Sequence, residues 1–187
     1  IFHGFGLGVC VNACFMGGGK SILVPIFTPE TVADIIRSKK PSFVIGVPTL
    51  FDALSRNPKM QKADLSCLLA TFSGADSLPR PVKERFEAMV KKQGGNVQLL
   101  EGYGLTEAVT AIMATPIGCY REGSIGVPFP DMLAKIVRLE TYDEAPIGEE
   151  GEIGVSGPAV MMGYLDQPEE TANTLKKHPD GRIWLHT

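Results

Sequence analysis

The first 110 residues alternate between short apolar runs and longer stretches in which apolar residues recur at helical spacing. The apolar runs predict strands at residues 21–24, 43–47, 68–72 and 97–101. The helically spaced stretches predict helices at residues 5–16, 29–40, 50–54 and 79–93. Strands and helices that alternate in units of roughly 25–30 residues favour a parallel sheet with helices on its faces.

Two of these helices carry clear local signals. Thr28 precedes Pro29, so a hydroxyl cap stands before a proline at the first helical position. The helix after Leu78 presents a buried face at spacings of four, three and one, made by Val82, Phe86, Met89 and Val90. The charged residues between them, including Lys83, are expected to face water.

The pattern changes after about residue 111. Apolar and charged positions alternate at residues 133–139, and glycines and prolines interrupt the chain at short intervals. Such alternation is typical of half-exposed antiparallel strands, with one helix expected at residues 168–176. The sequence therefore predicts an α/β fold, with a mostly parallel sheet flanked by helices in residues 1–110. A smaller antiparallel, β-rich and barrel-like subdomain is expected in residues 111–187, truncated at its C-terminal end.

Composition and charge exclude only a few classes of function. The 187 residues carry a formal net charge of −3 with acids and bases interspersed, which gives no indication of nucleic-acid binding. The four cysteines form no CxxC pair, which favours a reducing cytoplasm and buried, inert thiols. The apolar run at residues 5–16 is too short to span a bilayer, which needs about 20 apolar residues. No signal peptide is visible at the start.

The stretch LLEGYGLTEA at residues 99–108, which begins inside the last of the expected parallel strands, carries the densest candidate chemistry. Gly102 and Gly104 lack a Cβ atom, so the backbone can turn sharply and approach a ligand closely. Between them, Tyr103 offers a flat ring that can stack on a heterocycle such as adenine. Thr106 and Glu107 supply oxygen ligands suited to Mg²⁺ that carries nucleotide phosphates. A tight turn with a surface glutamate would explain the same residues without any ligand.

The pentapeptide at residues 103–107 resembles the Tyr-Gly-x-Thr-Glu signature of the adenylate-forming (AMP-binding) enzymes. This superfamily includes acyl-CoA synthetases, firefly-type luciferases and peptide-synthetase adenylation domains. Further matches follow in the family's order: FHGFG at 2–6, VPTL at 47–50, SGA at 73–75, and GEI at 151–153 leading to GP at 157–158 and GY at 163–164. The resemblance covers essentially the whole chain and implies an internal fragment of the large N-terminal domain.

The resemblance also implies roles for residues of the central motif. Tyr103 would lie against adenine in a pocket whose backbone includes Gly102 and Gly104. Thr106 would lie near the phosphates, and Glu107 would bind Mg²⁺. The metal would shield the triphosphate while the substrate carboxylate attacks the α-phosphorus and pyrophosphate leaves.

Other matched positions complete the implied site. Gly74 and Ala75 would pack along adenine and the bound acyl group, although a plain turn is the alternative there. His3 would lie at the acyl pocket near the carboxylate, in contrast to an ordinary packed or surface imidazole. Glu101 stands where related enzymes commonly carry an amide. Residues 151–164 are interpreted as scaffold, and His178 and His186 have no assigned role.

By resemblance, the parent protein is an acid–thiol ligase of the acyl-CoA synthetase type. It would convert a carboxylic acid, with a fatty acid expected, to an acyl-adenylate with ATP and transfer the acyl group to coenzyme A. Leu105 argues against a peptide-synthetase adenylation domain, which usually carries proline there, whereas a luciferase-like oxidase shares the motif. The remaining alternative is a non-catalytic folded fragment or binding module.

The chain begins without methionine and stops at residue 187, where a strand is forming, so we expect a piece of a longer protein. Related enzymes need an upstream phosphate loop, an aspartate just beyond this point and a lysine in a mobile C-terminal domain. The resemblance therefore implies that the isolated chain is inactive.

Overall fold

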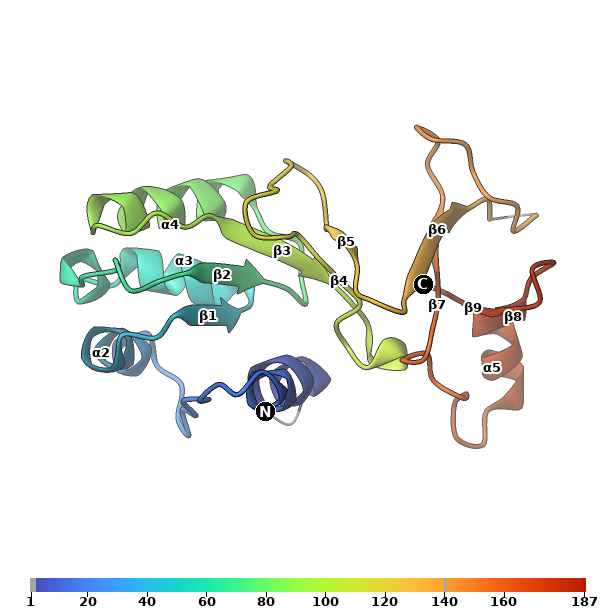
Figure 1. Ribbon diagram of the computed structural model, residues 1–187, viewed down its shortest axis with the longest axis horizontal. Helices are drawn as coiled ribbons and strands as arrows, with labels where there is room; N and C mark the ends of the chain where they lie inside the picture. The colour runs from blue at the N-terminus through green and yellow to red at the C-terminus, as the bar shows by residue number, and fades with distance from the viewer. Residues whose placement is uncertain (1–2, 140) are drawn as a thin grey trace.

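The computed structural model describes residues 3–139 and 141–187 and contains two sheets that lie side by side along its long axis (Figure 1). The first sheet has the strand order β1-β2-β3-β4-β5. Its strands are β1 (Phe43–Gly46), β2 (Ala70–Ser73), β3 (Leu99–Tyr103), β4 (Met113–Ala114) and β5 (Val127–Pro128). β1, β2 and β3 are parallel, whereas β3–β4 and β4–β5 are antiparallel pairs.

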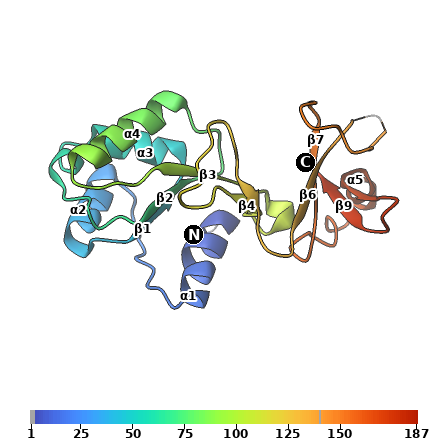
Figure 2. The same ribbon diagram turned by 45° about the horizontal axis from the view of Figure 1, so that its top comes forward.

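Helices and short helical turns accompany the first sheet. They are η1 (Gly6–Ala13), α1 (Cys14–Met16), α2 (Pro29–Lys39), α3 (Pro48–Arg56), η2 (Met60–Lys62), α4 (Arg80–Lys92) and η3 (Thr106–Ala108). The expected start of α2 is confirmed, because the Thr28 hydroxyl accepts a hydrogen bond of 3.0 Å from the Thr31 N–H. Figure 2 shows α3 and α4 over one face of the sheet, with the N-terminal helix on the other side.

The core of this first part is built on one large apolar cluster. α2, α3 and α4 pack their apolar faces against β1 and β3, and Phe51 meets Phe86 edge-on with ring centroids 5.0 Å apart. Both rings are buried, with 0 % and 1 % of their surface exposed. Of the four residues that the periodicity of α4 assigned to the core, Phe86, Met89 and Val90 are buried and Val82 is half-buried.

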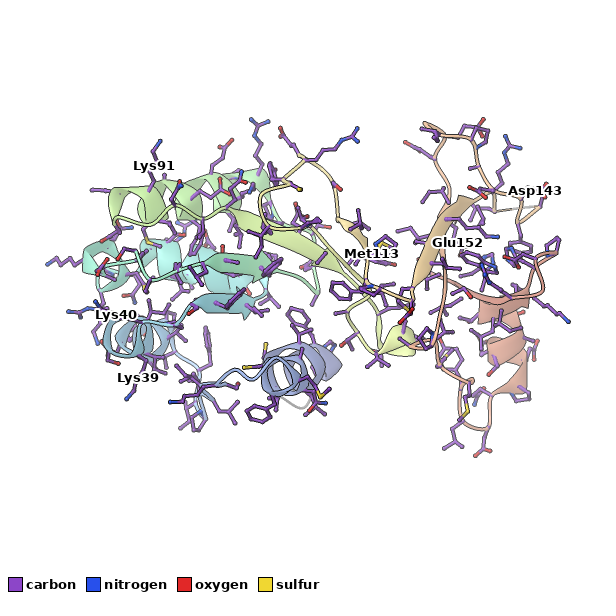
Figure 3. The ribbon with its side chains drawn as sticks, in the orientation of Figure 1. Lys39, Lys40, Lys91, Met113, Asp143 and Glu152 are labelled. Atoms are coloured by element: carbon purple, nitrogen blue, oxygen red, sulfur yellow. The ribbon has the colours of Figure 1, made fainter. Side chains whose placement is uncertain are left out.

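The second sheet is antiparallel and has the order β6-β7-β9-β8. Its strands are β6 (Leu133–Val137), β7 (Glu152–Ser156), β8 (Leu175–Lys177) and β9 (Ile183–His186), and α5 (Pro168–Thr174) precedes β8. Figure 3 shows Glu152 on β7, at the end of the strand that faces the loop carrying Asp143. A small apolar cluster, including Val155 and Leu185, packs between this sheet and the turn after β3.

A chain of polar side chains lies within the second sheet. Lys135 Nζ lies 2.9 Å from His178 Nδ1, and His178 Nε2 lies 2.9 Å from His186 Nε2. His186 Nδ1 lies 2.8 Å from a carboxylate oxygen of Glu152. Both imidazoles are buried, and the Lys135 ammonium also lies 4.0 Å from the centroid of the Trp184 ring. Two histidines that had no assigned role in the sequence therefore form one hydrogen-bonded chain.

The predicted fold class is confirmed: a helix-flanked sheet with a parallel portion is followed by an antiparallel sheet. The division at residues 110 and 111 stays a prediction. β4 and β5 follow residue 110 in the sequence, yet they belong to the first sheet, because β4 pairs with β3 and β5 pairs with β4. In the part of the chain that the structure describes, no helix combines the length and the apolar composition needed to cross a bilayer.

Three expectations for the N-terminal part and the cysteines are wrong. Residues 21–24 form no strand, because no neighbouring strand pairs with them. The helix at residues 5–16 forms but is not buried, since Phe15 and Met16 are 60 % and 89 % exposed. The thiols are not buried either: Cys119 is exposed and the other three are half-buried. An apolar sequence indicates a preference for burial, and burial also requires a packing partner.

Candidate functional site

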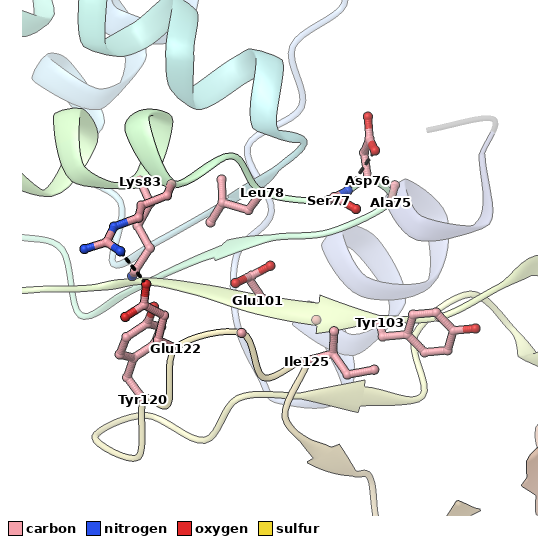
Figure 4. A pocket seen from close by; sticks show the side chains of 14 residues that line it. Ala75, Asp76, Ser77, Leu78, Lys83, Glu101, Tyr103, Tyr120, Glu122 and Ile125 are labelled. Atoms are coloured by element: carbon pink, nitrogen blue, oxygen red, sulfur yellow. Dashed lines mark hydrogen bonds and ion pairs between the residues drawn. The ribbon is translucent and has the colours of Figure 1, made fainter. Parts of the chain in front are cut away.

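A cavity of about 600 Å³ lies at the carboxyl end of β3, where ligands usually bind in open α/β sheets. Its wall combines the segment after β2, the first turns of α4, the end of β3 and the loop before β5 (Figure 4). The lining residues are Ala75, Asp76, Ser77, Leu78, Arg80, Lys83, Glu101, Gly102, Tyr103, Gly104, Tyr120, Glu122, Gly123 and Ile125. The volume falls within the range of small-molecule sites in proteins.

Four of the eight predicted site residues line this cavity: Ala75, Gly102, Tyr103 and Gly104. Thr106 and Glu107 begin η3 directly after this segment, and they do not line the cavity. Figure 4 shows Tyr103 extending from the end of β3, beyond Ile125. The structure therefore brings the aromatic ring and the small residues together and places the hydroxyl and the carboxylate just outside.

Gly74 and His3, the remaining two predicted residues, belong to a neighbouring surface on the side of the N-terminal helix. The Phe5 ring lies so close to Gly74 that a Cβ atom there would be 3.2 Å from it. A Cβ atom at Gly4 would be 2.3 Å from the Thr110 side chain. His3 itself is exposed, and its Nδ1 accepts a 3.1 Å hydrogen bond from the Phe5 N–H. The segment that carries His3 thus lies against both the end of β2 and the turn after η3.

Glycine is required at position 104 by a close approach of two backbone segments. A Cβ atom there would lie 1.8 Å from the Thr110 carbonyl oxygen, a distance no side chain can adopt. Val109 and Thr110 have left-handed φ angles of 54° and 70°, which are costly for β-branched residues. The turn that carries Glu107 is therefore tightly folded back onto β3.

One end of the cavity is lined by charged side chains, which the helical pattern did not predict. Lys83, expected to face water, is 8 % exposed. Its ammonium donates a 2.8 Å hydrogen bond to the Leu99 carbonyl oxygen, pairs with Glu87 one helical turn away and lies 4.0 Å from the Tyr120 ring centroid. Glu87 also accepts a 2.9 Å hydrogen bond from the Leu99 N–H. The i, i+4 spacing of Lys83 and Glu87 is the signal that could have indicated this pair.

Glu101 points from β3 toward the segment that carries Leu78 (Figure 4). Partial burial raises the pKa of its carboxyl group, and the positive charge of Lys83 and the Leu78 N–H act in the opposite direction. At the mouth of the cavity, Arg80 lies 3.0 Å from a carboxylate oxygen of Glu122. The Glu101 carboxylate thus offers a hydrogen-bond acceptor inside the cavity for a polar edge of a ligand.

Glu107 is held by residues from the segment between β7 and α5. Its carboxylate oxygen Oε1 accepts a 2.8 Å hydrogen bond from the Tyr164 hydroxyl, and its backbone carbonyl accepts a 2.7 Å bond from the Met161 N–H. The hydrogen bond to Glu107 raises the pKa of Tyr164, so the phenol stays protonated at neutral pH. The segment that was interpreted as scaffold thus contacts the candidate metal ligand directly.

The residues present fit a magnesium ion only in combination with a nucleotide. Among residues 3–139 and 141–187, no group of three or more His, Cys, Asp or Glu side chains could hold a metal ion by itself. Mg²⁺ commonly binds through one or two carboxylates together with substrate phosphates and water. A single half-buried carboxylate such as that of Glu107 matches this second mode.

Known sequences similar to this chain include ligases and a related monooxygenase. The chain is 42 % identical over 187 residues to the long-chain-fatty-acid–CoA ligase of Bacillus subtilis (strain 168), covering all of this chain and 32 % of the relative. It is 34 % identical over 185 residues to the luciferin 4-monooxygenase of Nipponoluciola cruciata, covering 99 % of this chain and 32 % of the relative. The chain thus spans about a third of the length of these curated relatives.

Solved structures share the fold along the whole chain. A long-chain-fatty-acid–CoA ligase from Archaeoglobus fulgidus superposes with a TM-score of 0.89 at 24 % identity, which shows a common fold, and covers 100 % of this chain and 38 % of that one. ATP-bound MatB from Rhodopseudomonas palustris superposes with a TM-score of 0.84 at 28 % identity, with coverage of 100 % and 38 %. The sequence profile described as "AMP-binding enzyme" matches residues 1–165. The chain belongs to the AMP-binding enzyme family.

Proposed function

We propose that the full-length protein containing this chain is an acid–thiol ligase of the acyl-CoA synthetase type. It converts a carboxylic acid and ATP to an acyl-adenylate and pyrophosphate, and then transfers the acyl group to coenzyme A. The observation that carries the proposal is the cavity lined by Ala75, Gly102, Tyr103 and Gly104, with Glu107 one turn beyond it.

The cavity suits the adenosine part of ATP. The Tyr103 ring offers a face for the adenine base, and small residues on the adjoining segments let a flat group lie against the backbone. The Glu101 carboxylate, inside the same cavity, can accept a hydrogen bond from an exocyclic amine. An adenine bound in this way would direct its phosphates toward the exposed hydroxyl of Thr106 and the carboxylate of Glu107.

In this proposal Glu107 holds Mg²⁺ together with the ATP phosphates. A bound Mg²⁺ would neutralise phosphate charge as pyrophosphate leaves. The contribution of the chain is then positioning: Glu107 and Thr106 orient the triphosphate, and no proton transfer is required because the substrate carboxylate is already ionised at neutral pH.

The acyl substrate is assigned to the surface that the N-terminal segment forms with the end of β2. His3 stands at the edge of this surface, and the Phe5 ring against Gly74 supplies an apolar wall. An apolar wall and the name of the relative at 42 % identity both support a fatty acid as substrate. The composition and the family together support a cytoplasmic location.

The isolated 187-residue chain is proposed to be inactive. It spans about a third of the length of its relatives, and one carboxylate beside an open cavity is a small part of the groups that phosphoryl transfer requires.

Adenylation by the full-length protein can be tested with a panel of carboxylic acids, scored by acid-dependent ATP–pyrophosphate exchange and by pyrophosphate release with and without coenzyme A. We expect exchange with long-chain acids, release that increases when coenzyme A is added, and no exchange by the isolated chain. Glu107→Ala should lower the adenylation rate by about 10-fold or more. Unchanged turnover in that variant would remove Glu107 from the site, and exchange by the isolated chain would refute its inactivity.

A luciferase-like acceptor reaction is the second candidate, because a luciferin 4-monooxygenase is 34 % identical to this chain. Both functions begin with adenylation, so the exchange assay does not separate them. Coenzyme A separates them: a thioester product identifies the ligase, whereas oxygen consumption after adenylation identifies the oxidase.

A further inference from the structure

The hydrogen bond between Tyr164 and Glu107 joins two segments that are far apart in the sequence. Tyr164 belongs to the segment between β7 and α5, whereas Glu107 lies in η3, directly after the first sheet's central strand. The geometry points to a role for Tyr164 as a positioning residue that holds the Glu107 carboxylate in the orientation needed to bind Mg²⁺-nucleotide. This inference rests on the proposed function, because it assigns Glu107 to the metal.

The backbone that carries Tyr164 is itself fixed by its neighbours. The Tyr164 N–H donates a 2.9 Å hydrogen bond to Thr171 Oγ1, and the Thr171 hydroxyl donates 2.8 Å to the Gln167 carbonyl oxygen. Gly163, with φ 147°, has its α-carbon so close to Thr171 that an added Cβ atom would lie 2.8 Å from that side chain. The phenol therefore projects from a tightly closed loop anchored on α5.

The same loop also fixes the backbone of Glu107. The Met161 N–H donates to the Glu107 carbonyl oxygen at 2.7 Å, so the main chain and the side chain of Glu107 are both bonded to one segment. Among the described residues, the Tyr164 hydroxyl is the one side-chain group that donates a hydrogen bond to the Glu107 carboxylate. Two attachments from one anchored loop restrict both the position and the rotation of the carboxylate.

This arrangement leaves the carboxylate able to bind a cation. A phenol is a neutral donor, so its hydrogen bond orients Oε1 without neutralising the negative charge, as an ammonium or guanidinium group would. The second oxygen, Oε2, stays available, and an ionised carboxylate has about four acceptor sites. A glutamate fixed in advance loses less side-chain freedom when the metal-bound nucleotide arrives, which strengthens binding.

The test measures binding of a non-hydrolysable ATP analogue to the full-length protein by calorimetry, once with excess Mg²⁺ and once with EDTA. Tyr164→Phe removes only the phenolic oxygen and should weaken binding with Mg²⁺ by about 10-fold, while binding in EDTA stays unchanged. In a Glu107→Gln background, Tyr164→Phe should have little further effect. Tyr142→Phe, which removes a phenolic oxygen from another loop near the second sheet, is the matched control and should bind like the wild type.

Each other outcome overturns a stated part of the argument. If the wild-type protein does not bind the nucleotide, both the proposed function and this inference fail. If it does bind and Tyr164→Phe binds equally well with Mg²⁺, only the positioning role fails. Equal weakening in Mg²⁺ and EDTA, or the same weakening in the Glu107→Gln background, would mean that Tyr164 stabilises the fold without acting through the carboxylate.

Discussion

The two sheets are stabilised by different kinds of interior. Around the parallel strands the helices and strands share one large apolar cluster, with Phe51 and Phe86 in edge-to-face contact, and the buried Lys83 bonds to the backbone beside it. The antiparallel sheet also has an apolar cluster, but it holds in addition the chain from Lys135 through His178 and His186 to Glu152. The stability of the apolar interior depends on close packing of its side chains. The stability of the polar chain depends on each of its side chains keeping its hydrogen-bond partner.

One proton arrangement satisfies the polar chain. The Lys135 ammonium must donate to His178 Nδ1, and the Glu152 carboxylate must accept from His186 Nδ1–H. One proton then remains between the two Nε2 atoms, so His178 donates to His186. An additional proton on either ring would leave two donors facing each other. This arrangement of donors and acceptors therefore has no place for a second proton on His178.

The largest expected effect is a loss of stability in the first sheet that leaves the second sheet unchanged. Phe51→Ala removes a ring that is 0 % exposed and leaves a cavity, which should cost about 3–5 kcal/mol. In the full-length protein, hydrogen exchange should accelerate at the amides of β1, β2 and β3 and stay unchanged in β7 and β9. Leu69→Ala, at an apolar position that is 63 % exposed, is the control and should change little. Equal acceleration in both sheets would mean that they open as one unit.

A smaller effect is expected from breaking the polar chain at one end. Lys135→Met keeps most of the side-chain volume but leaves His178 Nδ1 without its donor, at a cost of about 1–3 kcal/mol. Exchange should accelerate in β8 and β9, and the first sheet should not respond. Adding Glu152→Gln to Lys135→Met should cost less than the sum of the two single changes, because the chain is already broken. Additive costs would show that its members act independently.

The smallest effect concerns pH. Burial, the positive charge of Lys135 and the neighbouring His186 lower the pKa of His178 below its ordinary value of about 6.5. The unfolded chain therefore takes up a proton before the folded one, so stability is complete above about pH 6.5 and falls as pH decreases through the folded-state pKa. An NMR titration of the ring should show this lowered pKa, and Lys135→Met should raise it. An unshifted pKa would contradict the buried, neutral state.

The sequence predicted the parts of the fold that depend on local periodicity. Apolar spacing identified the buried face of α4, and the Thr28 cap with Pro29 identified the start of α2. Residues 21–24 were predicted as a strand because a short apolar run is typical of buried strands. Whether such a run pairs with another strand depends on residues that are distant in the sequence. The polar chain was missed for the same reason, since its histidines lie 43 and 34 residues from their charged partners.

The contiguous motif predicted which residues would lie together, and their role in binding a ligand stays a prediction. Gly102, Tyr103 and Gly104 line one cavity, because consecutive residues at a strand end remain together in any fold that keeps the strand. The Tyr164 contact with Glu107 spans 57 residues and has no local signal. Lys83 was misread because helical periodicity alone assigns charged residues to water, whereas a long side chain can reach a backbone carbonyl inside.

The pair of left-handed, β-branched residues after η3 has a consequence for attempts to make the protein more robust. A change to glycine at Val109, which is 65 % exposed, removes the steric strain of a β-branched side chain at φ 54°. The same change would let the turn that carries Glu107 relax away from its present path. If Glu107 holds the metal as proposed, variants of this bend that are selected for thermostability should also be screened for nucleotide binding.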